Sequence, residues 1–493
     1  MILRDYQTRG VMDLRAAYAR GLCAPLYVAP TGSGKTILFT HIAQSAVARG
    51  NTVWILVHRQ ELIHQTSAAL TALGVHHGLI AAGRYPGKAP VQVASVQTVA
   101  RRLGGKRLPP APSLMIVDEA HHAAAGSWRR IIQAMPDTRL LGVTATPLRL
   151  DGKGLGAYFD ALILGPATAE LIEQGWLARP VVYAPPIRAD LDGLHTVAGD
   201  YNRGEAAERM DKATITGDAV GHYKRICDGV PALAFCNSIK HAQHVAESFR
   251  GAGYRAASID GTMRDWQRAR LIADLGSGAL HVLTSCELVS EGIDIPVVTA
   301  AILLRPTQSL GLYRQQVGRV LRPAPGKTRA VILDHVGNCL RHGLPDDEPE
   351  WSLEGALRRK DKLAAPAVRQ CPACFAAHRP ASVCPICGHV YEVAAREVEE
   401  VAGDLQEIDA VTAARMRRQQ VGRARTREEL EVIARERGYN PGWVHYMMAA
   451  RERRGYHGPI DPRGPIHAMQ GLDAPAQRRP GEVEQLIREG EAL

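Results

Sequence analysis

A short stretch near the start of the chain has the residue types and the spacing of a phosphate-binding loop. It follows an apolar run at residues 23–28 and reads Ala29, Pro30, Thr31, Gly32, Ser33, Gly34, Lys35 and Thr36. Glycines let successive backbone N–H groups point at an anion, and the helix predicted at residues 37–48 adds the positive end of its dipole. We expect Lys35 to contact the β- and γ-phosphates of ATP and the Thr36 hydroxyl to bind Mg2+.

One residue departs from the usual pattern of this loop. Ala29 stands where the first glycine is normally found. The alternative to a nucleotide site is therefore a turn of glycine and serine before an ordinary helix.

Two carboxylates directly follow a second apolar run. Asp118 and Glu119 come after residues 114–117, which are Leu, Met, Ile and Val. A carboxylate at the end of a buried strand is costly unless a cation lies beside it. We expect Asp118 to hold the same Mg2+ as Thr36, and Glu119 to orient and deprotonate the attacking water. The alternative is that both acids cap the following helix. His122 is expected to face solvent.

Three polar side chains recur at every third position late in the chain, at Gln316, Arg319 and Arg322. On a helix, this spacing places them on one face. The block around them has no phosphate loop of its own, so two guanidinium groups on one face need an anion from elsewhere. The γ-phosphate across a cleft would supply it, which is the role of an arginine finger. The alternative is a basic surface helix.

Four of the nine cysteines form two Cys-x-x-Cys pairs, and they are Cys371, Cys374, Cys384 and Cys387. Four thiolates at this spacing suit the closed tetrahedral shell of a structural Zn2+ site. A redox dithiol is disfavoured because two pairs occur, and an iron–sulfur cluster remains the alternative. The module would either bind DNA or fasten the C-terminal segment to the rest of the chain. The other five cysteines lie in apolar runs, so no disulfide framework is expected.

Apolar runs that alternate with helical patterns indicate parallel sheets covered by helices on both faces. In residues 1–180 the apolar runs lie at 26–29, 53–58, 91–95, 114–117 and 140–144. In residues 181–345 they lie at 232–236, 256–259, 281–284, 298–304 and 330–334. We therefore predict an α/β fold with two tandem sheet domains. They are followed by a linker at 346–369, the zinc module at 370–390, a basic helical segment at 391–456 and a loosely ordered tail at 457–493.

The composition is that of a globular protein with an anionic partner. Of the 493 residues, 46% are hydrophobic and 22% are charged, and the formal net charge is +10. The first residues lack the apolar segment of a secretory signal. The longest apolar stretch, residues 295–304, is too short to span a bilayer. We therefore expect a cytoplasmic protein without membrane contact.

A basic segment lies at residues 411–456, with eleven arginines, no lysine and five glutamates. Thr426 and Glu429 have the spacing of a capping box, which predicts a helix that ends at Gly438. Pro441 suits the first turn of a second helix. Clustered arginines favour contacts with nucleic-acid phosphates. The larger apolar side chains are favoured as the core of this helix pair over base-stacking groups, and they are Leu430, Ile433, Trp443 and Tyr446.

These motifs, in this order, resemble the superfamily 2 DEAH-type helicases over residues 1–345. Residues 118–121 read Asp-Glu-Ala-His, and residues 144–147 read Thr-Ala-Thr-Pro, which resembles the third motif of that family. The resemblance implies two RecA-like domains that sandwich ATP and Mg2+ and close over the nucleotide. Nucleic acid would lie across both domains, and alternate gripping would move the protein along a strand.

The resemblance also implies roles for single residues. Residues 3–7 resemble the adenine-reading element, which implies nucleotide contacts from Arg4 and Gln7, with Gln7 at the base edge. Residues 284–294 and 313–322 resemble motifs V and VI. Further residues of the ATP site are then Gly292, Asp294 and Gln316. Nucleic-acid contacts are implied in motifs Ia, IV and V and in residues 95–98, and they are Arg59, Thr98, Ser238 and Thr284.

The layout of the whole chain most resembles the bacterial RadD group of DNA-repair helicases, or a phage relative. It implies a monomeric ATP-dependent DNA helicase or translocase that acts with a repair or recombination partner. An ATP-gated nucleic-acid-binding module that remodels or recruits a partner, with little unwinding, is the second hypothesis. An RNA helicase is the third, and the Thr-Ala-Thr sequence argues for DNA because RNA-directed relatives usually have Ser-Ala-Thr. The motor subunit of a restriction enzyme lacks support, because the rest of the chain has no nuclease-like acidic cluster.

Overall fold

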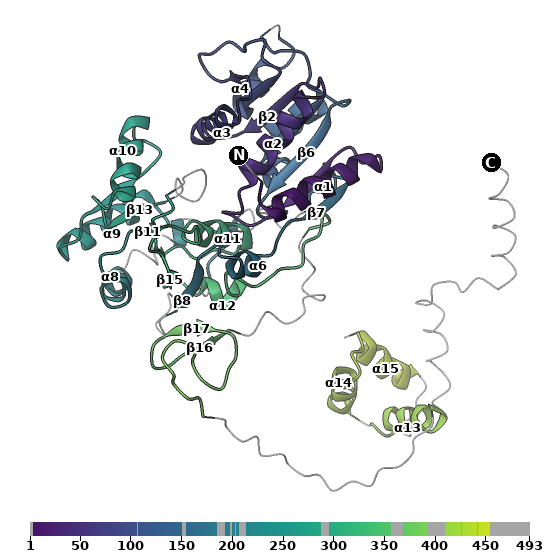
Figure 1. Cartoon of the computed structure of the whole chain (residues 1–493). Helices are drawn as coiled ribbons and strands as arrows, with labels where there is room; N and C mark the ends of the chain where they lie inside the picture. The colour runs from purple at the N-terminus through teal and green to yellow at the C-terminus, as the bar shows by residue number, and fades with distance from the viewer. Residues whose placement is uncertain are drawn as a thin grey trace, which may run out of the picture. The chain divides into compact units, whose positions relative to one another are not determined.

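The computed structural model describes most of the chain up to residue 392 and three helices beyond it (Figure 1). The described residues are 3–105, 107–149, 154–184, 193–197, 200–202, 204–206, 213–286, 295–355, 368–392, 410–424, 426–440 and 442–453. They belong to two compact units, Met1–Val393 and Ala394–Leu493, which we call the first unit and the second unit. The two sheets and the cysteine module all lie in the first unit.

The first sheet has seven strands in the order β3-β4-β2-β5-β6-β1-β7, and all of its strand pairs are parallel. The strands are β1 (Pro25–Val28), β2 (Val53–Val57), β3 (His77–Ile80), β4 (Val91–Ser95), β5 (Leu114–Asp118), β6 (Arg139–Thr144) and β7 (Ala161–Leu164). The five central strands match the five apolar runs predicted from the sequence, because strands covered on both faces are apolar throughout. The prediction missed the edge strands β3 and β7, most of whose residues are only half-buried.

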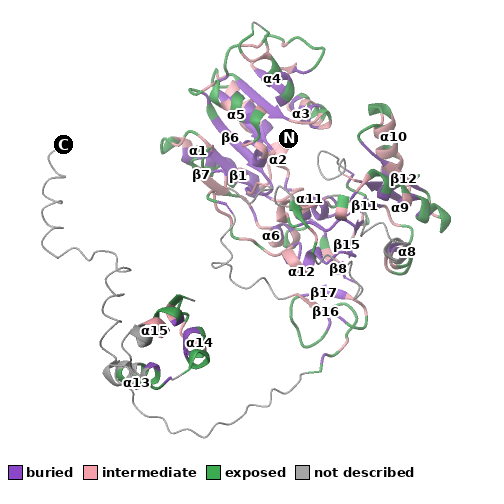
Figure 2. Cartoon of the chain, turned by 180° about the vertical axis from the view of Figure 1, so that it is seen from behind, coloured by how far each residue is buried: buried purple, intermediate pink, exposed green. Residues whose placement is uncertain are grey.

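Helices cover both faces of this sheet (Figure 2). Along β2, Val53, Ile55 and Val57 contribute to one hydrophobic core and Trp54 and Leu56 to another. Two cores form because successive side chains of a strand point to opposite faces. The helices of this domain are α1 (Asp5–Ala19), α2 (Lys35–Val47), α3 (Gln60–Ala72), α4 (Val96–Arg102), the 3-10 turn η1 (Ala120–His122) and α5 (Gly126–Gln133).

The second sheet has eight strands in the order β12-β13-β11-β14-β15-β8-β17-β16. The six from β12 to β8 pair in parallel, whereas β17 and β16 are added antiparallel. The strands are β8 (Arg179–Tyr183), β11 (Ala232–Phe235), β12 (Ala256–Ile259), β13 (Val282–Ser285), β14 (Ala300–Leu303), β15 (Arg329–Asp334), β16 (Arg369–Gln370) and β17 (Ala376–His378). The predicted α/β fold of two tandem parallel-sheet domains is confirmed.

The second domain also contains five of the helices that the structure describes in the first unit. They are α8 (Ala213–Cys227), α9 (Ile239–Gly251), α10 (Asp265–Gly276), α11 (Leu310–Gly318) and α12 (Asn338–His342). A small antiparallel ribbon joins β9 (Thr196–Val197) to β10 (Asp200–Tyr201). The connection between the two sheets contains α6 (Thr168–Glu173), and Leu171 of this helix packs into the core of the second domain.

Two segments are arranged differently from the domain layout expected from the sequence. The cysteine module does not stand apart, because Ala376 of β17 pairs with Tyr183 of β8 and Cys371 lies in the core of the second domain. The part of the expected linker at residues 346–355 runs from the second domain to the first. Its Trp351 and Leu353 contact the core that contains Phe159.

The second unit contains α13 (Ala410–Arg423), α14 (Arg427–Glu436) and α15 (Gly442–Arg453). The predicted capping box is present, since Thr426 Oγ1 accepts from Glu429 N at 3.2 Å and Thr426 N donates to the Glu429 carboxylate at 3.1 Å. Leu430 and Ile433 are buried in a small core against which Trp443 packs. The expectation was wrong for Tyr446, which is 37% exposed.

The other predictions for this unit have mixed outcomes. Gly438 follows α14 with a positive φ of 64°, as a helix-ending glycine does. Pro441 lies outside the described residues. Among the helices that the structure describes, none combines the length and the apolar content needed to cross a membrane.

Candidate functional site

The phosphate loop joins β1 to α2, as the sequence predicts. Gly32 and Gly34 have φ values of 88° and 79°, a region that glycine enters without steric cost. Lys35 turns back over the loop, and its Nζ donates to the carbonyl oxygens of Ala29 and Pro30, both at 3.1 Å. The Lys35 ammonium is thus held by loop carbonyls at the start of a helix, where a phosphate would sit.

The structure explains why alanine is accepted at the first position of the loop. Ala29 is buried, and its N–H donates to Thr144 O at 3.1 Å as a continuation of the strand pairing. The space for its methyl group is left by Gly165, where an added Cβ would come within 2.9 Å of Ala29 Cβ. The missing glycine therefore does not disturb the loop.

Asp118 and Glu119 lie at the carboxyl end of β5, on the same edge of the sheet as the loop. Asp118 is buried, and its Oδ1 accepts from Glu119 N at 3.0 Å. Glu119 has a positive φ of 51° and places its Oε2 3.5 Å from Nδ1 of His121. Residues other than glycine in the left-handed conformation are often found at functional sites.

The strand between β5 and β1 supplies a third set of groups. Thr144, at the end of β6, donates its hydroxyl proton to Thr146 O at 2.9 Å, and the same hydroxyl oxygen is hydrogen-bonded to His121 Nδ1 at 3.1 Å. Thr146 in turn reaches the second domain, because a Cβ on Gly311 of α11 would lie 3.1 Å from its hydroxyl. The Glu119 carboxylate is thus connected by contacts to α11.

The end of α11 packs directly on the phosphate loop. A Cβ on Gly318 would lie 2.6 Å from Thr31 Cβ, so this approach requires glycine. A Cβ on Gly32 would lie 3.4 Å from Cγ of Arg322. The two domains therefore meet at the loop, with arginines of the second domain beside it.

The helix that carries this motif is shorter than the spacing predicted. α11 ends at Gly318 with Arg319 as its cap, so Gln316, Arg319 and Arg322 do not share one helical face. Arg322 precedes Pro323, and the residue before a proline avoids the helical conformation. Tertiary packing still brings both arginines to the loop.

The charged groups of both domains influence the charge on Lys35. Burial lowers the pKa of the Lys35 ammonium; the carboxylates of Glu119 and Asp118 raise it, and the charges of Arg319 and Arg322 lower it further. Three cations and two carboxylates from both domains thus act on one loop. Like charges so close together are unfavourable unless an anion neutralises them.

Gln7 contacts the backbone of the phosphate loop, and its expected role at the base edge stays a prediction. Its Nε2 donates to the carbonyls of Ser33 at 3.3 Å and Gly34 at 3.2 Å, and its Oε1 accepts from Arg4 N at 3.0 Å. Tyr6 adds a bond from its hydroxyl to Ser33 O at 2.9 Å. The Nε2 end of the Gln7 amide therefore holds the phosphate loop, while its Oε1 end is fixed by the backbone at the start of α1.

The other residues expected around the nucleotide have different placements. The Arg4 guanidinium stacks on the ring of Trp176, 3.8 Å from its centre. No motif in the sequence had indicated this tryptophan. Gln316 is buried, and its Oε1 has no hydrogen-bond partner among the described residues. Gly292 and Asp294 lie outside the described residues.

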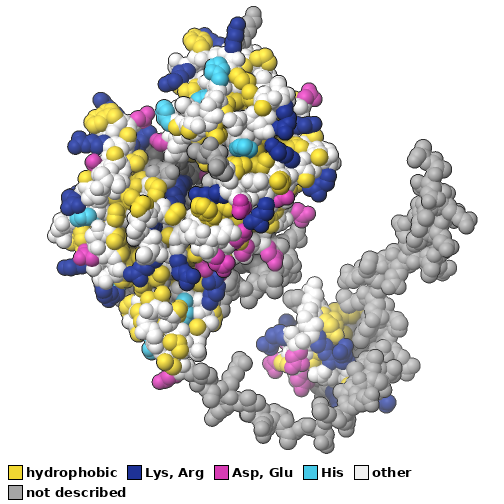
Figure 3. All heavy atoms as spheres, viewed as in Figure 1, with side chains coloured by type: hydrophobic (Ala, Val, Ile, Leu, Met, Phe, Trp, Pro, Cys, Tyr) yellow, Lys and Arg dark blue, Asp and Glu magenta, His cyan; other side chains and the backbone are white. Residues whose placement is uncertain are grey.

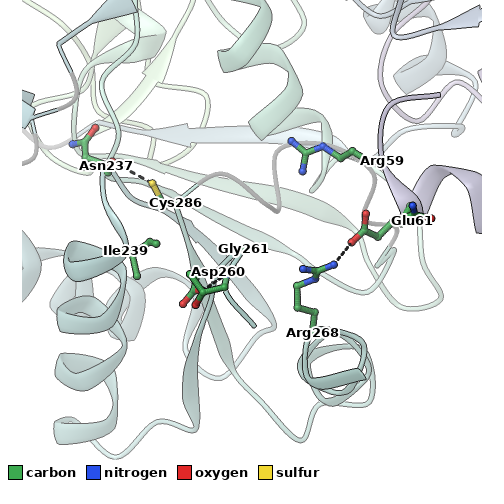
Figure 4. Close-up of a pocket in the computed structure, with 10 residues that line it drawn as sticks. Arg59, Glu61, Asn237, Ile239, Asp260, Gly261, Arg268 and Cys286 are labelled. Atoms are coloured by element: carbon green, nitrogen blue, oxygen red, sulfur yellow. Dashed lines mark hydrogen bonds and ion pairs between the residues drawn. The ribbon is translucent and has the colours of Figure 1, made fainter. Parts of the chain in front are cut away.

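A cavity of about 590 Å3 lies between the two domains (Figure 4). On the side of the first domain it is lined by Arg59, Gln60 and Glu61 at the start of α3, and the Arg59 guanidinium points into it. On the side of the second domain it is lined by Asn237, Ile239, Asp260, Gly261, Thr262, Arg268 and Cys286. An ion pair of 3.1 Å between Glu61 and Arg268 joins the two sides.

Of the four residues expected to contact nucleic acid, only Arg59 lines this cavity. Ser238 lies between two lining residues and caps α9, its Oγ accepting from His241 N at 3.0 Å. Thr98 is buried in α4, and Thr284 is fully buried with its hydroxyl donating to Ala242 O at 2.7 Å. The structure does not bring these two threonine side chains to the cavity, because both face the interior of their domains.

Three histidines connect Arg59 with the carboxylates. Arg59 Nε donates to His58 Nε2 at 3.3 Å, the His58 and His122 rings are 4.9 Å apart, and the His122 and His121 rings are 4.1 Å apart. His122 is half-buried within this row, so the expectation that it faces solvent was wrong. In the sequence, the adjacent residues His121 and His122 were the only indication of this row of histidines. Their position in the chain does not reveal that His58 lies next to them.

The four cysteines come together as the metal prediction requires. Their Sγ atoms all lie within 4.8 Å of one another, with Cys371 to Cys387 at 3.6 Å and Cys374 to Cys384 at 3.8 Å. Four sulfurs at about 2.3 Å from a tetrahedral Zn2+ would be separated by about 3.8 Å. The donor set therefore fits zinc in number, type and spacing.

Models of known protein families match both sheet domains and the cysteine module. Residues 1–149 match the family of the type III restriction enzyme res subunit, and residues 221–324 match the helicase conserved C-terminal domain. Residues 357–400, which contain the cysteine module, match the ribosomal L32p protein family. A 51.5 kDa protein of a Lactococcus phage is 34% identical over 368 residues, which cover 74% of this chain and 77% of that protein. The chain belongs to the superfamily 2 helicases.

Two further similarities concern a helicase relative and the fold. A Schizosaccharomyces pombe protein described as the mitochondrial ATP-dependent helicase irc3 is 31% identical over 70% of this chain, which spans 59% of that protein. An HsdR fragment of a type I restriction enzyme from Vibrio vulnificus shares the fold with a TM-score of 0.56 and 21% identity. That match covers 70% of this chain and 66% of the fragment. Superfamily 2 helicases are ATP-dependent enzymes that act on nucleic acids, and this protein belongs to that class.

Proposed function

We propose that this protein is an ATP-dependent DNA helicase or translocase. The observation that carries the proposal is the meeting of Lys35, Asp118 and Glu119 of the first domain with Arg319 and Arg322 of the second at one phosphate loop. A nucleotide bound there would touch both domains, so its hydrolysis would change the contact between them. The cavity with Arg59 lies between the same two domains and would change with it.

Each group of the nucleotide site has a role in this proposal. Mg2+ would be held by Thr36 and Asp118, and it would neutralise charge on the phosphates that Lys35 contacts. Glu119 would take a proton from the attacking water, and its place is supported by the contact with His121. Arg319 and Arg322 would stabilise the charge that develops on the γ-phosphate. Gln7 would hold the phosphate loop in the conformation that binds it.

Nucleic acid would bind along the cavity between the domains. Arg59 offers a fork of donors that suits a phosphate, and Ser238 lies at the start of α9 beside lining residues of the second domain. On the face shown in Figure 3, lysine and arginine side chains are present on both sheet domains. This distribution suits a backbone that passes over both of them.

We assign DNA as the substrate and a role in repair or recombination like that of the RadD group. The support is the Thr-Ala-Thr sequence at residues 144–146 together with the cysteine module and the arginine-rich second unit. In this proposal the protein works as a monomer in the cytoplasm and acts with a repair protein.

The test is steady-state ATP hydrolysis without nucleic acid and with single-stranded DNA, duplex DNA or RNA, at one fixed salt concentration because phosphate binding depends on salt. We expect DNA to stimulate hydrolysis and RNA to do so much less. Lys35→Ala serves as the background control, because it removes the ammonium from the loop. Stimulation by RNA alone would replace DNA with RNA as the substrate. A lack of stimulation by any nucleic acid would favour the partner-remodelling module.

We also propose that the four cysteines bind one structural Zn2+ per chain. Metal analysis of the purified full-length protein should find about one zinc and no iron, and Cys384→Ser should lose it. Because β17 continues the second sheet, metal removal by a chelator should also lower the melting temperature of the protein. Cys23→Ser is the matched control, since Cys23 is an exposed cysteine outside the cluster. Iron in the preparation, or no metal, would overturn the assignment.

A further inference from the structure

The chain crosses between the two sheet domains twice within the described residues. The first crossing contains α6, and the second is formed by residues 344–355, which return from the second domain to the first. A single crossing would leave the domains free to swivel about it. Two crossings define an axis and restrict the domains to hinge-like opening, the type of closure that kinases and similar enzymes use.

At its start, the second crossing is bonded to the second domain through Asp347. Its Oδ2 accepts from Leu344 N at 2.7 Å, its Oδ1 accepts from Arg379 at 2.7 Å, and its carbonyl accepts from Arg314 of α11. Arg379 also bonds Asp346 at 2.9 Å. Because Arg379 directly follows β17, the cysteine module anchors this end of the segment to the second sheet.

At its end, the same segment is bonded to the first domain. Gly156 N donates to Leu353 O at 2.9 Å, and a Cβ on Gly154 would lie 2.0 Å from that oxygen, so the two backbones touch. Trp351 and Leu353 pack on the core that includes Leu155. Between the two ends, Glu348 accepts from the first N–H of α6 at 3.3 Å, which adds a contact to the other crossing.

Arg314 connects this segment to the nucleotide site. Its guanidinium lies 5.7 Å from the centre of the Trp351 ring and bonds the carbonyl of Asp347. Burial lowers the pKa of this guanidinium, and Glu348, Asp347 and Asp346 counteract the shift. In Figure 3, acidic side chains gather on the side of the molecule where α6 and α12 lie. Arg314 therefore has acidic neighbours in the segment as well as direct contacts with Trp351 and Asp347.

A narrow crevice of about 20 Å3 shows how near the segment comes to the phosphate loop. It is lined by Pro345 of the segment, Arg314 and Gly318 of α11, and Pro30 and Thr31 of the loop. α11 is therefore enclosed between residues 344–355 on one side and the phosphate loop on the other.

We propose that residues 344–355 form a strap that holds α11 against the first domain, with Arg314 as the positioning residue through which the strap acts. The strap keeps Arg319 and Arg322 beside the phosphate loop while the cavity on the Arg59 side is free to open. This role rests on the proposed ATPase function. In this proposal the cysteine module anchors the strap to the second domain through Arg379.

The test compares Leu353→Ala with Leu103→Ala in the full-length protein. Both leucines are partly buried against the same core of the first domain, but only Leu353 belongs to the strap. For Leu353→Ala we expect kcat for ATP to fall by about 10- to 100-fold, because misplacing a catalytic group by an ångström has effects of this size. The Kd of a fluorescent ATP analogue should stay within about twofold, since the phosphate loop itself is unchanged.

Two further variants separate positioning from folding. Leu353→Met keeps the volume and should keep the rate. Arg314→Lys keeps the charge but loses the planar group that lies on Trp351, and it should reduce kcat without weakening nucleotide binding. Hydrogen exchange supplies a readout that does not depend on activity. In Leu353→Ala, the amides of Gly156 and α11 should exchange faster, while those of β2 and β5 should not change.

Some outcomes would overturn the strap. An equal loss of kcat in Leu103→Ala would show that the effect belongs to the core, and unchanged exchange in α11 would show that the segment does not hold it. If the parent protein hydrolyses no ATP under any condition, the proposed function fails. The exchange experiment still tests the strap in that case.

Discussion

Glu119→Gln is expected to bind ATP as the parent protein does and to hydrolyse it about 10²- to 10⁴-fold more slowly, the usual contribution of a general base. Glutamine has the same shape and can keep the 3.5 Å approach to His121, but it cannot take a proton from water. The measurement is single-turnover hydrolysis together with the Kd of a fluorescent ATP analogue.

The comparison of binding and turnover makes this prediction specific. Lys35→Ala should lose both, because it removes the cation that holds the phosphates. If Glu119→Gln also loses both, Glu119 has a structural role, for which its left-handed conformation and its half-buried position beside Asp118 would be the reason. Unchanged turnover would remove Glu119 from the mechanism.

Arg322→Ala is expected to lower turnover by about 10³-fold or more, as the loss of an arginine finger does. Arg322 lies beside Gly32 of the loop and shares the field around Lys35 with Arg319. ATP binding should change little, because the stabilising charge matters most as negative charge develops on the transferred phosphate. Single-turnover rates at saturating ATP measure this directly.

Two control variants accompany the Arg322 experiment. Arg322→Lys keeps the charge without the forked donors and should recover only part of the rate. Arg20→Ala removes an exposed arginine at the end of α1 and should have the parent rate. A loss of ATP affinity equal to the loss of rate would show that Arg322 binds the ground state and is not a finger.

Local patterns in the sequence were sufficient for the parallel sheets and for the phosphate loop. Strands such as β2 are apolar at every position because both faces are covered, so the run is visible without any knowledge of the fold. The phosphate loop and the two Cys-x-x-Cys pairs are also local, because their chemistry requires fixed spacing within a few residues. The capping box at Thr426 belongs to the same class.

The sequence did not indicate which distant segment a given side chain contacts. Gln7 bonds the backbone of Ser33 and Gly34, and the Thr284 hydroxyl bonds α9. A motif gives the residue type at such a position but not the direction of its side chain. Trp176 and His58 were missed for the same reason, since their partners are remote in the sequence.

The amino-acid sequence by itself was sufficient to predict the fold class, the position of the phosphate loop with its neighbouring carboxylates, and the four cysteines that come together in the cysteine module. Only the tertiary structure decided that α11 ends at Gly318, that the cysteine module extends the second sheet, and that residues 346–355 lie across both domains. Periodicity and spacing report contacts along one element, whereas these features depend on which surfaces approach each other when two domains pack. An acidic segment with prolines looks like a linker until its contacts with Arg314 and with the apolar core of the first domain are known.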